Sequence, residues 1–381
     1  MVFGSEELRA RISPLFEDNF TSGSDLGAAI SIWHRGESAL ELCGGFRDAH
    51  RERPWTNDTL VLFWSATKGL GSACLLHLLQ DRQISLQRLV AEFWPEFAQN
   101  GKAQITIAQL LSHQSGLVAV DEQIDITDYD AVITALARQK PLWPPGTAHG
   151  YHARTFGFLI DELVRRIDSR PISKYWRQVF ADPLGLDIWI GLPAEENHRV
   201  ATIYAAKTSS IAPTTEFYRY LTTPGTIQRR TFTSPGGLQA VSAMNMPENR
   251  ARDLVSLGGI GSAHGLGKFY ALLANGGEME GRRFFSTETM GWMTRTLADG
   301  KDLVFEIPTA FSAGFMKDSN QTTRRIFGPS LFAFGHPGAG GSHAFADPET
   351  NVAFAYVMNQ MERQILPDEK SLRLVDAIYS P

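Results

Sequence analysis

Segments with the pattern of β-strands lie near both ends of this 381-residue chain, and the middle has the pattern of helices and loops. Residues 26–46 contain two short apolar runs around a turn at 34–36, which predicts a β-hairpin. Residues 331–359 again contain short runs rich in Phe, Val and Tyr, separated by Gly and Asp-Pro. This order favours an α/β fold of the α+β type, with one antiparallel sheet built from both chain ends and flanked by helices.

The helical middle then forms an inserted lobe. We expect residues 1–80 and 251–381 to form the sheet subdomain and residues 81–250 a mainly helical subdomain, with a cleft between them. Helices are predicted at about 5–20, 65–80, from about 155 onward, at 266–274 and at 371–379. The helix at 65–80 carries its apolar residues at helical spacing, which predicts one buried stripe.

Composition narrows the class of protein. With 43% hydrophobic residues, 20% charged residues and a net charge of −5, the chain is typical of a soluble globular protein. It has no run of like charges that would bind nucleic acid or an anionic membrane surface. No stretch approaches about 18 apolar residues, and the first 25 residues are too charged for a secretion signal. We therefore expect a cytoplasmic protein without a membrane span.

Two further sequence features carry no chemistry of their own. The only cysteines are Cys43 and Cys74, and their spacing fits neither a CxxC redox pair nor a zinc knuckle, so free thiols are favoured over a disulfide. Glycines at 258–261 lack the GxGxxG spacing, which favours a backbone turn over a nucleotide loop. We expect no cofactor and no metal.

The sequence Ser65-Ala66-Thr67-Lys68 is the strongest local candidate for chemistry. Residues three apart share a helix face, so the Ser65 hydroxyl and the Lys68 amine lie within reach of each other. A serine becomes a nucleophile when a neighbour takes its proton, and a lysine does so when burial or positive potential lowers its pKa. Taken alone, the pattern is also compatible with a surface lysine in a helix that Ser65 caps.

Two further elements follow Ser65 and Lys68 along the chain. Tyr151 comes after a Pro-Pro-Gly turn and just before a predicted helix, and beside a protonated lysine its hydroxyl could shuttle a proton as phenolate. A buried structural tyrosine is the alternative. The glycine-rich stretch from His336 to Gly341 is predicted on a strand, where its backbone N–H groups could stabilise an oxyanion.

In this order, the three motifs resemble those of serine β-lactamases and penicillin-binding proteins. The pattern Ser-x-x-Lys, then Tyr-x-x, then His-x-Gly is most similar to class C β-lactamases and family VIII carboxylesterases. Supporting segments include LLSHQSGL at 110–117 and GHPGAGGSHAFADP at 335–348, and the similarity covers about residues 10–375. No GxSxG elbow and no HExxH motif occurs, which disfavours an α/β-hydrolase or a zinc peptidase.

The resemblance implies a role for each matching residue. Ser65 would be the acylated nucleophile, Lys68 its activating base and Tyr151 the proton relay to and from the leaving group. The backbone N–H groups of Ser65 and Ala339 would form the oxyanion hole, in a cleft between the two subdomains. His336, Gly338 and Ala153 would contact the substrate. His113, within LLSHQSGL, would be a structural residue and not a base.

Two departures from the lactamase pattern favour a carboxylesterase acting on small to medium esters. Ala153 occupies the position of the asparagine in Tyr-x-Asn, and His336 occupies that of the lysine in Lys-Thr-Gly. Several alternatives stay open: a β-lactamase, a D-amino-acid peptidase or amidase, an acyltransferase, or a scaffold that has lost catalysis. The expected partner is a small-molecule ester, and the sequence indicates no oligomeric state.

Overall fold

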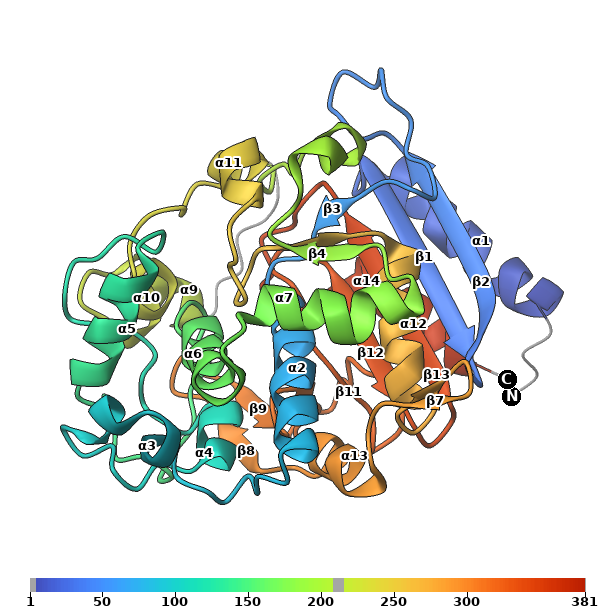
Figure 1. Ribbon diagram of the computed structural model, residues 1–381. Coiled ribbons are helices and arrows are strands. Elements are labelled where there is room, and N and C mark those ends of the chain that lie inside the picture. Colours follow the sequence, from blue (N-terminus) through green and yellow to red (C-terminus); the bar gives the residue numbers. More distant parts are fainter. Residues whose placement is uncertain (1–4, 208–215, 381) are drawn as a thin grey trace.

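An eight-stranded antiparallel sheet organises the computed structural model, which describes residues 5–207 and 216–380 (Figure 1). Its strand order is β2-β1-β13-β12-β11-β10-β9-β8. The strands are β1 (Gly27–His34), β2 (Glu37–Gly45), β8 (Ala298–Lys301), β9 (Pro308–Phe311), β10 (Met316–Lys317), β11 (Phe334–Gly335), β12 (His343–Asp347) and β13 (Val352–Met358). Because β1 pairs with β13 along its length, the two chain ends share one sheet, as the sequence predicts.

Side chains alternate between the two faces of this sheet, and each face packs on a different set of helices. Ile30 and Phe354 point into the core formed with α1 (Ser5–Thr21) and α14 (Glu369–Tyr379). Ala29 and Ala355 point to the opposite face, where α12 (Ala263–Ala274) lies. The small side chains on that face let α12 approach closely. The predicted hairpin and the predicted helices near both chain ends are thereby confirmed.

The middle of the chain contributes most of the helices, seen in teal, green and yellow in Figure 1. They are α3 (Val90–Phe93), α4 (Ile107–Leu111), α5 (Tyr129–Arg138), α6 (Phe156–Asp168), α7 (Ile172–Trp176), α8 (Asp182–Leu184), α9 (Glu216–Thr222), α10 (Ile227–Thr233) and α11 (Pro247–Arg250). The subdomain boundaries at 80 and 250 stay a prediction. One short strand from the middle segment, β4 (Ile188–Ile190), pairs with β5 (Gly259–Gly261), which lies outside it.

Helix α2 (Thr67–Asp81) lies between the sheet layer and the helices of the middle segment (Figure 1). Twelve of its fifteen residues are buried, so the predicted single buried stripe is wrong. The helix is covered on several sides because it contacts α6, α7 and α13 (Thr287–Thr294). Two glycines, Gly69 and Gly71, make this packing possible: an added Cβ would lie 2.7 Å from the Tyr270 hydroxyl and 2.4 Å from Val255, respectively.

The glycine cluster at 258–261 also differs from its prediction. Instead of a turn, Gly259–Gly261 form β5, the middle strand of a small sheet with the order β3-β5-β4, where β3 is Val61–Leu62. A separate hairpin is formed by β6 (Glu278–Met279) and β7 (Arg282–Arg283). Across residues 5–207 and 216–380, none of the helices has both the length and the apolar character needed to cross a membrane.

Candidate active site

Ser65 lies in the tight turn that joins β3 to α2. Trp64, just before it, adopts a left-handed conformation with φ of 52°, which is unusual for a residue with a bulky side chain. The turn is held in place because Phe63 N donates to Gly259 O at 2.8 Å, and Gly259 N donates to Thr67 Oγ1 at 2.8 Å. Strand β5 therefore fixes the backbone on both sides of Ser65 and leaves this serine half-buried.

The Lys68 amine is fully buried and is held by three oxygen atoms. Its Nζ lies 3.1 Å from Ser65 Oγ, 2.8 Å from Ala153 O and 2.7 Å from Ser256 O. Carbonyl oxygens can only accept hydrogen bonds, so the two carbonyls take two N–H bonds of the amine. An uncharged amine then has its lone pair left for the Ser65 hydroxyl.

The surroundings of Lys68 favour this uncharged form. Burial is the largest cause that lowers the pKa of the Lys68 amine well below its ordinary value, and the positive charge of Arg154 lowers it further. Both influences disfavour an ammonium ion in the resting protein. The geometry and the electrostatics of Lys68 therefore agree with a proton acceptor placed beside a serine.

Tyr151 completes the group that the sequence predicts. The Lys68 Nζ lies 5.0 Å from the centre of its ring, and its hydroxyl shares a hydrogen bond with the Ser65 side chain. Burial raises the pKa of the Tyr151 phenol above its ordinary value, the bond to Ser65 opposes this rise, and the charge of Asp302 adds to it. The predicted phenolate is therefore disfavoured, because a buried phenol beside an uncharged amine keeps its proton.

Two residues that sequence reasoning missed support this group. Asp302 is fully buried, and its Oδ1 accepts the backbone N–H of Tyr151 at 3.2 Å and that of Val304 at 2.7 Å. Ser256 supplies one of the carbonyl oxygens that hold Lys68. A single aspartate and a single serine outside any motif give no sequence signal.

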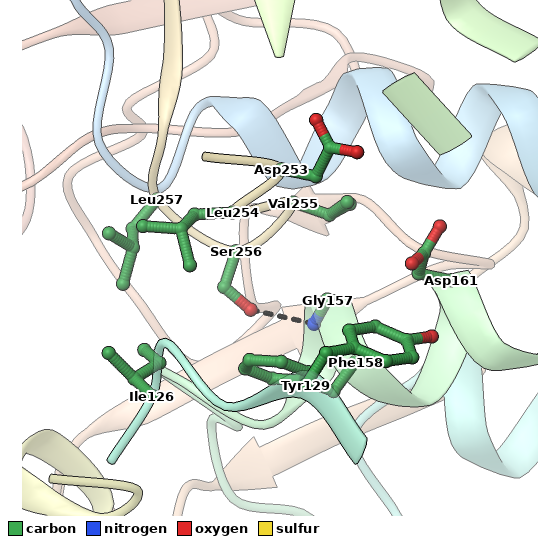
Figure 2. Close-up of a pocket in the computed structure, with 10 residues that line it drawn as sticks. All are labelled: Ile126, Tyr129, Gly157, Phe158, Asp161, Asp253, Leu254, Val255, Ser256 and Leu257. Carbon is green, nitrogen blue, oxygen red and sulfur yellow. Dashed lines mark hydrogen bonds between the residues drawn. The ribbon is translucent and has the colours of Figure 1, made fainter. Parts of the chain in front are cut away.

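The hydroxyl of Ser256 connects the Lys68 site to helix α6. Its Oγ accepts the backbone N–H of Gly157 at 2.6 Å, shown in Figure 2, and donates to Arg154 O at 2.9 Å. The small pocket in that view is lined by Ile126, Tyr129, Gly157, Phe158, Asp161, Asp253, Leu254, Val255, Ser256 and Leu257. Because its lining includes none of Ser65, Lys68 and Tyr151, this pocket is not the catalytic site.

The stretch from His336 to Gly341 approaches Ser65 from the C-terminal part of the chain. It follows the two-residue strand β11 as a turn before β12, so its predicted placement on a strand is wrong. Gly338 packs directly on the backbone before Ser65: an added Cβ would lie 2.1 Å from Phe63 O. Its own N–H donates to Ser342 O at 2.7 Å, which leaves it none for a ligand.

The two backbone N–H groups predicted to form an oxyanion hole have no competing partner. Within the part of the chain that the structure describes, neither Ser65 N nor Ala339 N donates to a protein acceptor. Ala339 directly follows the glycine that touches the segment before Ser65, and it is half-buried. Both donors are therefore free for a ligand, and their role as an oxyanion hole stays a prediction.

His336 and Ala153 lie beside the same group. Nδ1 of His336 is 2.8 Å from Pro337 O, so Nδ1 carries the proton and Nε2 keeps a lone pair. Burial is the largest cause that lowers the pKa of His336 to about 3, which keeps the ring uncharged at neutral pH. Ala153 contributes its carbonyl oxygen to Lys68, and its methyl group offers no hydrogen bond. Substrate contact at His336, Gly338 and Ala153 stays a prediction.

The His113 ring contacts the Tyr151 ring, and His113 holds the loop at residues 150–152 by hydrogen bonds. Its Nδ1 accepts the backbone N–H of His152 at 3.1 Å, and its carbonyl oxygen accepts that of Gly150 at 3.1 Å. Burial lowers the pKa of its imidazole well below the ordinary value. Among the described residues, no group of three or more His, Cys, Asp or Glu side chains is placed to hold a metal ion.

Comparisons with known proteins show the family of this chain. The family model described as Beta-lactamase matches residues 16–377. Esterase/beta-lactamase LipL of Mycobacterium tuberculosis is 33% identical over 371 residues, which cover 94% of this chain and 83% of that protein. A solved family VIII carboxylesterase superposes with a TM-score of 0.87 at 35% identity, covering 98% of this chain and 97% of the other.

A penicillin-binding protein homologue from Caulobacter crescentus superposes equally well, with a TM-score of 0.88, 35% identity and coverages of 98% and 97%. The family resemblance that the sequence motifs indicate is thereby confirmed, together with the mixed fold of helices and antiparallel sheet. Because the family model spans nearly the whole chain, this protein belongs to the beta-lactamase family.

Proposed function

We propose that this protein is a serine carboxylesterase that forms an acyl-enzyme on Ser65. The observation that carries the proposal is the Lys68 amine, which is fully buried, held by two carbonyl oxygens and 3.1 Å from Ser65 Oγ. A serine is activated when a neighbouring base receives its proton, and an uncharged lysine in this position is such a base. The protein family and the two esterase-named relatives support the same reaction class.

In the acylation step, Ser65 Oγ forms a bond to the carbonyl carbon of the ester while its proton passes to Lys68 Nζ. The carbonyl oxygen becomes an oxyanion, which accepts hydrogen bonds from the N–H groups of Ser65 and Ala339. When the tetrahedral intermediate collapses, the bond to the alcohol oxygen breaks. That oxygen takes a proton from the Tyr151 hydroxyl, which is refilled from the Lys68 ammonium, so charge and protons balance.

Water completes the cycle by attacking the acyl group on Ser65. Its proton passes through Tyr151 to Lys68, the tetrahedral intermediate uses the same two N–H donors, and Ser65 leaves with a proton returned from Lys68. The raised pKa of Tyr151 and the lowered pKa of Lys68 suit these roles, since a neutral phenol donates and a neutral amine accepts. The substrate is a neutral ester of small to medium size.

Esters should be preferred over β-lactams, because this site lacks two contacts for a β-lactam. Ala153 offers no side-chain amide to hydrogen-bond the amide of the drug, and the uncharged His336 offers no cation to its carboxylate. Losing one neutral and one charge-assisted hydrogen bond removes roughly 2 to 5 kcal/mol of recognition. We expect kcat/KM for p-nitrophenyl butyrate to exceed that for nitrocefin by about 100-fold or more. Comparable values for the two substrates would favour a β-lactamase.

The direct test uses a fluorophosphonate probe, which reacts with activated serines. Peptide mass spectrometry should find a single adduct on Ser65, and S65A should lose both the adduct and ester turnover while keeping its circular dichroism spectrum. Removing a nucleophile lowers kcat by several orders of magnitude, so turnover above about 1% of wild type would assign the nucleophile elsewhere. An adduct on another serine would overturn the assignment in the same way.

A further inference from the structure

Arg154 is a buried arginine that the proposed reaction does not use. Only 6% of its surface is exposed, and its Nε is buried without a hydrogen-bond partner in the described part of the chain. Its Nη2 donates to the carbonyl oxygens of Gly236 and Gly237, which are uncharged. Asp125 acts on it through its charge and without a hydrogen bond. A guanidinium that is buried with so little compensation is destabilising.

The backbone fixes Arg154 next to the Lys68 amine. Ala153, one residue before it, supplies a carbonyl oxygen 2.8 Å from Lys68 Nζ. The Arg154 carbonyl oxygen accepts the hydroxyl of Ser256, whose own carbonyl oxygen lies 2.7 Å from the same Nζ. The Arg154 backbone is therefore part of the frame that holds the Lys68 amine.

We propose that Arg154 is a positioning residue that keeps Lys68 uncharged in the resting enzyme, because it holds a second buried positive charge near the Lys68 amine. This inference rests on the proposed function, in which Lys68 is the base. Like charges in a low-dielectric interior repel strongly, and of the two groups the lysine loses its proton far more easily than the guanidinium.

Among the described residues, Arg154 is the charged side chain that acts directly on the Lys68 amine, whereas the charge of Asp302 acts on Tyr151. Four further titratable side chains lie near the amine: Tyr151, His113, His152 and His336. Burial lowers the pKa of each of these histidines and raises that of the tyrosine, so all four are uncharged near neutral pH. Burial lowers the pKa of Arg154 only to about 10, so it stays charged there.

The test measures how fast Ser65 reacts with the fluorophosphonate probe from about pH 5 to about pH 10. The acid limb of this profile, where labelling slows as the pH falls, reports the pKa of the base. In R154Q the Lys68 amine should hold its proton to higher pH. We expect the acid limb to move up by about one pH unit, so that labelling at about pH 6 falls about tenfold and the alkaline plateau changes less than about threefold.

Two more variants keep the test decisive. R250Q removes a different buried arginine, which is 8% exposed and also has a pKa lowered to about 10, and its acid limb should coincide with that of wild type. D125N removes the negative charge that partly offsets Arg154, so its limb should move down slightly even if R154Q does not fold.

This inference is overturned if folded R154Q keeps the acid limb of wild type, or if R250Q shifts the acid limb as much as R154Q does. If R154Q does not fold, an unshifted acid limb in D125N overturns it instead. The proposed function fails separately, when the probe does not label Ser65 in the wild-type protein or when K68A labels as fast as wild type.

Discussion

A lysine that is completely buried and lacks a carboxylate partner is unusual, because a buried ammonium loses its hydration without compensation. In this protein, Lys68 avoids that loss because its lowered pKa leaves the amine uncharged and because its N–H bonds donate to two carbonyl oxygens. The third neighbour, Ser65 Oγ, then lies where the lone pair remains. At the scale of a single residue, the requirement to satisfy a buried amine and the requirement to activate a serine lead to the same geometry.

The proton relay between Lys68 and Tyr151 leads to a prediction on coupling. K68A and Y151F should each lower kcat for an ester by about 10²- to 10⁴-fold, the usual size of a general acid–base contribution. Because the two groups move the same proton, the double variant should be much less impaired than the product of the two single effects. The measurement is kcat for all three variants with p-nitrophenyl butyrate.

Y129F is the matched control, since it removes the hydroxyl of another tyrosine, one that contacts Glu162 outside the catalytic group. It should keep kcat within about threefold of wild type. Two single effects that multiply in the K68A/Y151F double variant would contradict a shared relay, and a small loss in Y151F alone would make Tyr151 a residue that only orients the substrate.

At the scale of elements, the active site forms where two turns touch: the β3–α2 turn with Ser65 and the β11–β12 turn with Gly338. A Cβ on Gly338 would lie 2.1 Å from Phe63 O, and backbone atoms cannot shift as easily as the end of a side chain. We predict that G338A pushes Ala339 N away from Ser65 and lowers kcat by at least about tenfold, because an oxyanion donor loses its position.

G291A serves as the control for G338A. Gly291 lies in helix α13, where an added Cβ would have nothing within 4 Å and alanine favours the helix. The kcat of G291A should match that of wild type, and the midpoint temperature of its thermal unfolding should stay equal or rise. Wild-type kcat in G338A would show that the contact between the two turns does not position the donor.

The elements that the sequence predicts well are those with a long local pattern. The hairpin at 26–46, the helix after Ser65 and the C-terminal helix all carry periodic apolar residues over many positions. The wrong assignments concern very short elements: β11 has two residues and β5 has three, so neither leaves a period to detect. Burial on all sides of α2 depends on three other helices and is equally invisible in its own sequence.

The residues of the candidate site also differ in how well the sequence predicts them. Ser65, Lys68 and Tyr151 are found by their spacing and order, because the chemistry requires those side chains. Ser256 acts on Lys68 through its carbonyl oxygen, which every residue type possesses, so no residue pattern marks it. The motif position of Ala153 likewise gives no sign that its carbonyl oxygen binds Lys68. Three-dimensional contacts are needed to identify such residues.

At the scale of the whole molecule, the site depends on contacts between distant parts of the chain. Ser65 comes from the N-terminal part, Tyr151 from the middle and His336 from the C-terminal part, and the pairing of β1 with β13 joins the two ends. Several histidines are enclosed by this folding. Burial lowers the pKa of His152, His336 and His343 to about 3 in each case.

These three histidines should make the folded state sensitive to acid. In the unfolded chain a histidine takes up a proton near pH 6.5, whereas in the folded protein these three do so only near pH 3. The unfolded state therefore binds more protons between these values, and stability is lost as pH falls from about 6.5 toward 3. Each histidine adds about 1.4 kcal/mol per pH unit to the slope well below pH 6.5. The measurement is the free energy of unfolding in urea between about pH 6 and about pH 4.5.

The contribution of one histidine can be isolated at His343, which lies on β12 with its ring against Phe345 and Phe354, in the core shared by α1 and α14. H343Q replaces it with a side chain that does not titrate, so the slope of stability against pH should fall by about 1.4 kcal/mol per pH unit, whatever the loss in absolute stability. H198Q, at an exposed histidine, is the control and should leave the slope unchanged. An unchanged slope in H343Q would mean that this buried imidazole takes up its proton equally well in the folded and the unfolded protein, and acid sensitivity would then have to come from other groups.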